Sequence, residues 1–210
     1  ILFKNLDEYT TGIIDSTSVK SLTGYYSDLN TIYNSSGISG LGNEEIIISD
    51  ATLAASLLNT LDEYTTGNID ASTVTTFTGN VSDINAAYAS SDISGLSNEE
   101  IIISDSIIAT SLLNTLDEYT TGNIDASEIT TFSGDTSDTS ATNASSGITG
   151  LGNEEIIISD TIIAASLLNT LDENTTGNID ASTVKTLFGK ISDINAAYTS
   201  SGITGLGNEE

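Results

Sequence analysis

A tandem repeat with a period of about 55 residues is the feature of this sequence that most restricts its fold. The motif Leu-Asp-Glu-x-Thr-Thr-Gly begins at Leu6, Leu61, Leu116 and Leu171. At the same interval, Leu-Gly-Asn-Glu-Glu begins at Leu41, Leu151 and Leu206, and at Leu96 with serine in place of the glycine. Two segments, which begin at Ser82 and Ser111 and represent the two halves of a unit, share a Ser-x-[Leu/Ile]-Asn pattern. Each repeat therefore divides into two coils of about 25 and 30 residues, a length typical of solenoid repeats.

The repeats follow one another without a linker. Their approximate bounds are residues 1–40, 41–95, 96–150 and 151–205, and a further repeat begins at 206–210. We therefore predict one continuous solenoid over residues 1–210. The sequence begins at Ile1 without an initiator methionine and ends at Glu210 inside a motif. We expect it to be part of a longer protein, in which its open ends either continue into adjacent repeats or stack end to end on copies of itself.

Each repeat is expected to hold two short helices. Ser49 and Asp50 are placed to cap the helix of the longer coil, and Ser82 to cap that of the shorter coil. The apolar face of the longer helix consists of Leu53, Ala54, Leu57, Leu58 and Leu61, and that of the shorter helix of Ile84, Ala87 and Tyr88. The third repeat has Thr139, Ser140 and Asn143 where the second has Ile84, Asn85 and Tyr88, so we predict a locally loosened coil there.

A turn residue is expected at the C-terminal end of each helix. The positions are Gly12, Gly67, Gly122 and Gly177 in one coil, and Gly37, Asp92, Gly147 and Gly202 in the other. Asp92 is the one non-glycine residue among them. Because aspartate tolerates the left-handed conformation better than most residues, we predict that these positions adopt it.

Segments rich in β-branched residues lie between the expected helices. They cover residues 69–77 in one coil, and Ile93 with residues 101–103 in the next. Neither a short strand nor a two-turn helix is stable alone, but stacked coils would form continuous ladders around a continuous core. The sequence predicts an α/β solenoid with short parallel strands on one side and short helices on another. The alternative is an all-β solenoid.

Composition limits the partners. The chain has 30 acidic and 4 basic residues, a formal charge of -26, and no cysteine, histidine, proline, methionine or tryptophan. No positive charge lies between Lys20 and Lys185, so the surface would repel nucleic acid and anionic membranes. No apolar segment approaches the roughly 20 residues of a transmembrane helix. We expect no nucleic-acid partner and no membrane insertion.

Catalysis is not expected. Paired carboxylates such as Glu99 and Glu100 could in principle act as acid and base, but adjacent residues of a strand point to opposite faces. Without histidine, cysteine, arginine or a glycine-rich phosphate loop, nucleophilic, zinc-dependent and nucleotide-dependent reactions lack their usual residues. The sequence predicts a protein that is not an enzyme.

Calcium is the one ion to which the motifs point. The segment from Asp172 to Asp180 resembles an EF-hand loop, and in the third repeat Glu128 occupies the twelfth position after Asp117. The candidate ligands are Asp172, Asn174, Asp180, Asp117, Asp125 and Glu128. No copy has a full ligand set. The alternative is a helix end that turns into a strand, with no cofactor, and diffuse cation binding along ladders of aspartates such as Asp70 and Asp125 is a third interpretation.

Two segments resemble a known kind of repeat. They are residues 57–72, LLNTLDEYTTGNIDAS, and residues 192–209, SDINAAYTSSGITGLGNE. They look like the tandem repeats of giant secreted cell-surface proteins in marine unicellular cyanobacteria, and the resemblance covers the whole chain. It implies an extracellular protein on the outer cell surface, of the kind associated with adhesion, surface layers or swimming motility.

The expected function is that of a structural segment in a long acidic extracellular or cell-surface protein, acting as a spacer, a surface layer or a filament. The alternative is a repeat adhesin or a binding module rigidified by calcium, for which a cell-surface polysaccharide is the expected ligand.

Overall fold

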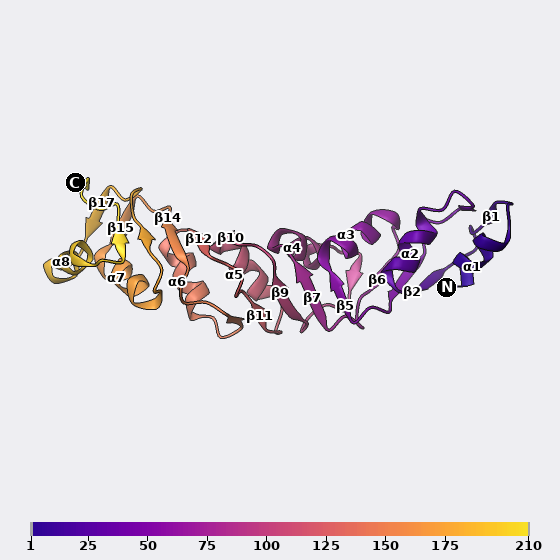
Figure 1. The fold of residues 1–210 in the computed structure, drawn as a ribbon, viewed down its shortest axis with the longest axis horizontal. Coiled ribbons are helices and arrows are strands. Elements are labelled where there is room, and N and C mark those ends of the chain that lie inside the picture. Colours follow the sequence, from indigo (N-terminus) through magenta and orange to yellow (C-terminus); the bar gives the residue numbers. More distant parts are fainter. Residues whose placement is uncertain (1, 210) are drawn as a thin grey trace. The chain divides into compact units, whose positions relative to one another are not determined.

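The computed structural model describes residues 2–209 and shows an α/β fold in which strand–helix units repeat regularly and the strands are parallel (Figure 1). The chain divides into two compact parts, Ile1–Ile101 and Ile102–Glu210. We call these the N-terminal part and the C-terminal part, and each is described by itself. The recurring helices agree with the expected α/β class and not with the all-β alternative.

The helices are short and recur in both parts. The N-terminal part contains α1 (Leu2–Tyr9), α2 (Tyr26–Tyr33), α3 (Ala55–Tyr64) and α4 (Val81–Ala89). The C-terminal part contains α5 (Thr110–Tyr119), α6 (Thr136–Ala144), α7 (Ala165–Asn174) and α8 (Ile191–Thr199). Within each part, every helix packs on the next one in the chain.

The strands have two to four residues. The N-terminal part contains β1 (Ile14–Asp15), β2 (Ser21–Gly24), β3 (Ile38–Ser39), β4 (Glu45–Ile48), β5 (Thr52–Ala54), β6 (Ile69–Asp70), β7 (Thr76–Gly79) and β8 (Ile93–Ser94). Strand β9 (Glu100–Ile103) spans the division. The C-terminal part contains β10 (Ile107–Ala109), β11 (Ile124–Asp125), β12 (Thr131–Gly134), β13 (Ile148–Thr149), β14 (Glu155–Ile158), β15 (Ile162–Ala164), β16 (Ile179–Asp180), β17 (Thr186–Phe188) and β18 (Ile203–Thr204).

Units with two strands alternate with units with three. Strands β6 and β7 precede α4, for example, whereas β3, β4 and β5 precede α3. The first residues of α2, α3 and α4 are Tyr26, Ala55 and Val81, so the step from α2 to α3 is longer than the step from α3 to α4. The two unequal segments of each repeat are therefore real, and the third strand accounts for the longer one.

The strand ladders advance by a shorter step than the helices. In the C-terminal part, β10, β12, β14, β16 and β18 form one parallel sheet, whose neighbouring strands pair residues 24 or 23 positions apart. Strand β10 is the third strand of its unit, β12 and β14 are second strands, and β16 and β18 are first strands. Along this one sheet of five strands, the contributing strand therefore changes from the third strand of a unit to the first strand of a unit.

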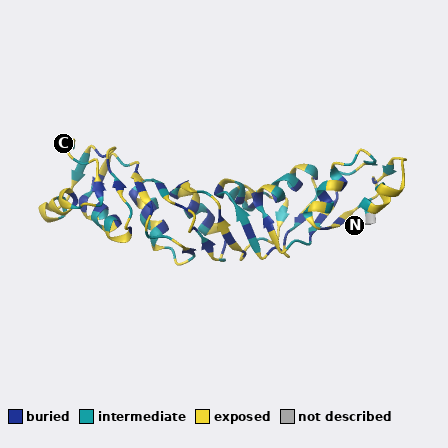
Figure 2. Ribbon diagram, in the orientation of Figure 1, coloured by how far each residue is buried: buried dark blue, intermediate teal, exposed yellow. Residues whose placement is uncertain are grey.

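Mainly aliphatic side chains, with Phe77 and Phe132 as the largest that are fully buried, fill the space between strands and helices. Strand β4 alternates, with Ile46 and Ile48 buried and Glu45 exposed, as expected for a strand with one face on a core. Leu58 and Leu61 of α3 are also fully buried. Figure 2 shows buried positions along the strands and the inner faces of the helices, and exposed positions at the turns. Each helix is too short to be stable alone, so this packing holds it.

The predicted helix caps were wrong, although the helices were correctly placed. Leu53 lies in β5 rather than in α3, which begins after Ala54 with no side-chain cap. The cap of α4 is Asn80, whose Oδ1 accepts a hydrogen bond from the Asp83 N–H at 2.8 Å, and not Ser82. Asp50 instead accepts a hydrogen bond from Tyr26 N–H, in the preceding unit. The sequence rule assumes a local cap, and here the third strand separates Asp50 from the helix that follows it.

The turn glycines serve close packing and not a left-handed backbone. Neither Gly67 nor Gly177 has a positive φ, and a Cβ on either would overlap a backbone carbonyl oxygen, that of Glu44 or of Glu154. Within residues 2–209 no residue other than glycine has a positive φ, so Asp92 is not left-handed either. The positive values fall at other glycines, such as Gly40, Gly95, Gly150 and Gly205, with φ of 87°, 89°, 87° and 83°.

The third repeat keeps the helix that we expected to be loosened. Thr136, Thr139 and Thr142 of α6 are buried where α4 has Val81, Ile84 and Ala87. The Thr139 hydroxyl donates to the Asp135 carbonyl at 2.8 Å, and the Thr142 hydroxyl donates to Asn114 Oδ1 at 2.7 Å. Because the buried hydroxyls find acceptors, α6 stays packed on α5 despite its polar face.

Candidate functional site

The first glutamate of the Asn-Glu-Glu motif is buried in three of the four copies, whereas Glu209 of the fourth copy is half-buried. Glu44, Glu99 and Glu154 are 1, 2 and 1% exposed. The glutamates that follow them, Glu45, Glu100 and Glu155, each begin a strand and are exposed. The paired carboxylates therefore face opposite sides, as expected from the sequence.

Each buried carboxylate closes the turn that leads into a strand. The two oxygens of Glu44 accept hydrogen bonds from Gly42 N–H at 3.1 and 2.9 Å. Glu99 does the same with Ser97 N–H at 2.8 and 2.9 Å, and Glu154 with Gly152 N–H at 3.0 and 2.9 Å. Bonds to an ionised acceptor are stronger than neutral ones, so these contacts fix the turn.

A tyrosine eleven residues earlier donates its hydroxyl to the same glutamate. Tyr33 donates to Glu44 Oε1, and Tyr88 donates to Glu99 Oε2 at 2.7 Å. Tyr198 donates to Glu209 Oε2 at 2.6 Å. The third repeat differs, because Asn143 occupies the tyrosine position before Glu154. Sequence reasoning missed this pair, although the constant spacing of eleven was a visible signal.

Tyr33 also stacks on Tyr64. Their ring centroids are 5.0 Å apart and the ring planes differ by 22°. The Tyr64 hydroxyl donates to Asn30 Oδ1 at 3.1 Å and accepts from Asn34 Nδ2 at 2.9 Å, so α2 and α3 are joined at this point. Burial, together with the Glu44 carboxylate that accepts its hydrogen bond, raises the pKa of the Tyr33 phenol far above its ordinary value.

The calcium candidates at helix ends take part in bonds between units. Asp172 Oδ2 accepts a hydrogen bond from Ser200 Oγ at 2.6 Å, and Asp117 Oδ2 from Ser145 Oγ at 2.8 Å. Each bond spans 28 residues, as does the one from Ser35 to Asp7. These bonds tie the end of one helix to the turn after the next one.

Among the described residues, the remaining calcium candidates do not belong to an acidic cluster that could hold a metal ion. Asp180 and Asp125 accept hydrogen bonds from the N–H groups of Ser182 and Ser127 at 2.9 and 3.0 Å. Asn174 is the exposed last residue of α7, and Glu128 is exposed in a turn. Among residues 2–209, no group of three or more acidic side chains is placed to hold a metal ion.

The aspartates that end strands β6, β11 and β16 have lowered pKa values. The hydroxyl of Ser72 and then its N–H group hold the pKa of Asp70 below its ordinary value, and Ser127 and Ser182 do the same for Asp125 and Asp180. These carboxylates stabilise tight turns through their charged form. Their neighbours across the ladder are not further aspartates: Asp70 pairs with Ile47 and Ser94.

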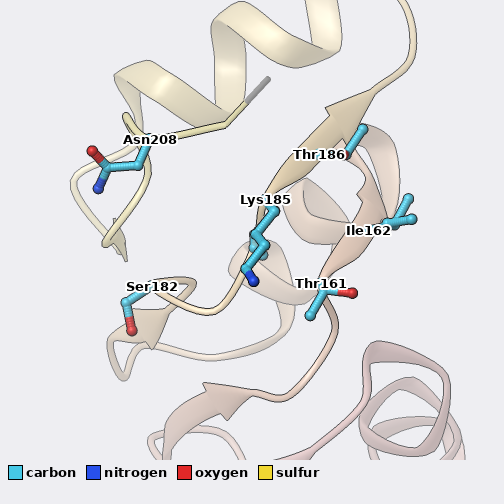
Figure 3. A pocket seen from close by; sticks show the side chains of 7 residues that line it. Thr161, Ile162, Ser182, Lys185, Thr186 and Asn208 are labelled. Atoms are coloured by element: carbon cyan, nitrogen blue, oxygen red, sulfur yellow. The ribbon is translucent and has the colours of Figure 1, made fainter.

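A hollow of about 540 Å³ lies beside β17 in the C-terminal part. Figure 3 shows Lys185 near the centre of the hollow, between Ser182 and Thr161, and Asn208 on the side opposite Ile162. Strand β12, the equivalent of β17, is bordered at this side by β14. The hollow is thus lined in part by β17, an edge strand among the described residues, whereas the equivalent β12 has a strand on both sides.

The described residues define a repetitive parallel α/β protein whose recurring polar side chains bond to each other and to turns. No known protein family, curated protein or solved structure matches the chain. Within residues 2–209, no helix is long and apolar enough to cross a bilayer.

Proposed function

We propose that this chain is a structural segment of a long acidic extracellular or cell-surface protein, in which its units stack into a continuous solenoid that acts as a spacer, a surface layer or a filament. The observation that carries the proposal is the use made of the repeated polar side chains. Successive units are joined by the bonds from serine hydroxyls to aspartates 28 residues earlier, and by the bond from Tyr26 N–H to Asp50. The Tyr–Glu bonds fix the turns between units. Most of the polar residues that recur between repeats thus serve the stacking itself.

The exposed apolar side chains at α8 support stacking on further units. Ile191 is 77% exposed, whereas its equivalent Val81 in α4 is 3% exposed. Figure 2 shows α8 largely exposed. In the N-terminal part, Leu6 of α1 is likewise 49% exposed, although its equivalent Leu61 is fully buried. Adjacent repeats, or copies of the chain placed end to end, are the partners that would cover both surfaces.

The charge favours an exterior setting and argues against anionic partners. The formal charge is -26, and the described residues contain a single ion pair, Lys4 to Asp28 at 3.2 Å, so the charged groups of the surface are predominantly negative. Such a surface keeps a long repeat protein soluble and repels nucleic acid and anionic lipid. The resemblance to cyanobacterial cell-surface repeats agrees with this setting.

The proposal is tested by changing the number of repeats. Chains with one, two and three added copies of residues 96–150 should each lengthen by the same increment in small-angle scattering, and the unfolding midpoint should rise toward a plateau. A maximum dimension that grows as the cube root of chain length would show globular folding and would overturn the proposal.

A further inference from the structure

The stacked tyrosines Tyr33 and Tyr64 lie on consecutive helices and come from different repeats. Their rings are nearly parallel, with centroids 5.0 Å apart. Both side chains are half-buried, and each hydroxyl has its own acceptor, Glu44 for Tyr33 and Asn30 for Tyr64. The two phenols are thus held together in the folded chain, whereas they are 31 positions apart in sequence.

The surroundings of Tyr33 favour the loss of a proton and an electron from its phenol in one step. Its hydrogen bond to Glu44 places a carboxylate base directly on the phenol. A phenol in such a bond can transfer its proton to the acceptor as the electron leaves, which avoids a high-energy phenol cation. Oxidation to the neutral tyrosyl radical is therefore easier at Tyr33 than at a phenol that faces only water.

The composition of the chain directs oxidation to tyrosine. It contains no cysteine, methionine, tryptophan or histidine, which are the other side chains that common oxidants attack, but it has 8 tyrosines. A chain without cysteine also has no disulfide with which to join its units. Tyrosine is therefore the residue through which these repeats could acquire a covalent link.

The two positions change together. Tyr33 and Tyr64 correspond to Asn143 in the third repeat and Asn174 in the fourth, where both rings are lost. Packing alone would tolerate one aromatic ring on an aliphatic neighbour. The joint loss fits a pair whose role needs both phenols.

We propose that Tyr33 and Tyr64 form an oxidative cross-linking site, at which a haem peroxidase with a hydroperoxide joins the two rings as dityrosine. Each phenol loses one electron and one proton, and the two radicals couple at ring carbons ortho to the hydroxyls. The two aromatic C–H bonds are replaced by one C–C bond, and both hydroxyls are restored after tautomerisation. Two hydrogen atoms leave in all, and one hydrogen peroxide is reduced to two water molecules.

The link would staple α2 to α3. It closes a loop within the N-terminal part, and a cross-link of this kind stabilises a fold chiefly by restricting the unfolded chain. Such a staple would serve a structural protein outside the cell, but the chemistry follows from the two rings and Glu44 whether or not the proposed function is right.

The test treats the folded chain with hydrogen peroxide and a haem peroxidase at a protein concentration low enough to suppress links between molecules. We expect dityrosine fluorescence, an intact mass lower by two hydrogen atoms for each link, and a proteolytic fragment in which Tyr33 is joined to Tyr64. Tyr64→Phe should abolish this fragment, whereas Tyr9→Phe, at a far more exposed tyrosine, should leave it unchanged. The same treatment in denaturant should lose the preference for this pair.

A gain of the link provides the complementary test. The double substitution Asn143→Tyr and Asn174→Tyr should add a further loss of two hydrogen atoms, mapped to these positions in the C-terminal part. Links from Tyr64 mainly to tyrosines other than Tyr33, an unchanged total yield of dityrosine in Tyr64→Phe, or the same distribution of links in the folded chain and in denaturant would each overturn the proposal.

Discussion

Asp50 caps a helix that begins 24 residues before it: its Oδ2 accepts a hydrogen bond from the Tyr26 N–H at 2.7 Å. The C-terminal part repeats this relationship between Asp160 and the Thr136 N–H, also at 2.7 Å. The residue before α2, Tyr25, offers no side-chain cap. Each such helix start is therefore completed only when the following unit is in place, which couples the folding of neighbouring units.

Removing this cap between units should destabilise the N-terminal part. Asp50→Ala should lower the free energy of unfolding by about 1 kcal/mol, the usual effect of losing a helix cap. Asp50→Asn should lose much less because the amide oxygen still accepts the bond. Urea unfolding followed by circular dichroism measures both, with Asp92→Ala at an exposed position as the control. Equal midpoints for the alanine variants would show that the bond contributes nothing.

The two glutamates of one pair should respond very differently to substitution. Glu44→Ala leaves the Tyr33 hydroxyl and the Gly42 N–H without their buried acceptor and should destabilise by about 2 kcal/mol. Glu45→Ala removes an exposed side chain and should change the stability little. Parallel thermal melts of the two variants provide the comparison, and a larger effect at Glu45 would contradict the turn-closing role.

Acidification should weaken the turns closed by Asp70, Asp125 and Asp180. Their pKa values are lower in the folded chain than in the unfolded chain, because serine hydroxyls and N–H groups favour the charged form. The resulting stabilisation is fully present above the ordinary value near 3.8 and is lost as the pH falls through the folded-state value.

The matched variant for that experiment replaces all three aspartates by asparagine. Asparagine keeps a turn-closing oxygen but does not titrate, so below about pH 4 the variant should lose less stability than the native chain. Comparing the two chains also removes the opposite effect of discharging the acidic surface, which both share. Parallel pH dependences of the two unfolding midpoints would refute the assignment.

Monovalent salt should stabilise this chain, and calcium should add nothing beyond screening. Raising the salt concentration from 0.1 to 1 M shortens the Debye length from about 10 to about 3 Å and so suppresses repulsion among the carboxylates. At matched ionic strength, millimolar calcium followed by a chelator should leave the melting midpoint unchanged. A calcium-specific rise that the chelator reverses would instead favour the calcium-rigidified module.

The periodicity of the sequence was enough to predict the α/β class, the parallel strands and the two unequal segments of each repeat. It did not reveal the third strand of the longer segment, because residues 107–109 and their equivalents adjoin the helix and share its apolar character. The expected cap at Asp50 failed for the same reason. Helical spacing cannot separate a short strand from the first turn of the helix that it precedes.

The candidate site could not be found from loop motifs alone. The EF-hand-like spacing led to Asp172 and Asp180, but in the fold Asp172 bonds to Ser200, 28 residues away, and Asp180 bonds to its own turn. The Tyr33 and Glu44 contact was readable in principle from its constant spacing. The stack of Tyr33 on Tyr64 was not, because it depends on how far one helix is shifted against the next.

Neighbouring strands of a ladder are 24 or 23 residues apart, so two steps do not equal the sequence repeat of about 55 residues. This difference limits the lengths of sequence that the gene can gain or lose. Two steps of a ladder lead from Phe132 through Ile156 to Ile179, whereas the equivalent of Phe132 in the next repeat is Leu187. The pattern of strand neighbours therefore recurs only after a complete repeat. Unequal recombination that adds or removes one complete repeat leaves every strand with a suitable partner, but loss of a single strand–helix unit would bring two units of the same kind together. The length of this protein can therefore change by whole repeats while the contacts between neighbouring units stay the same, so length can evolve independently of the fold.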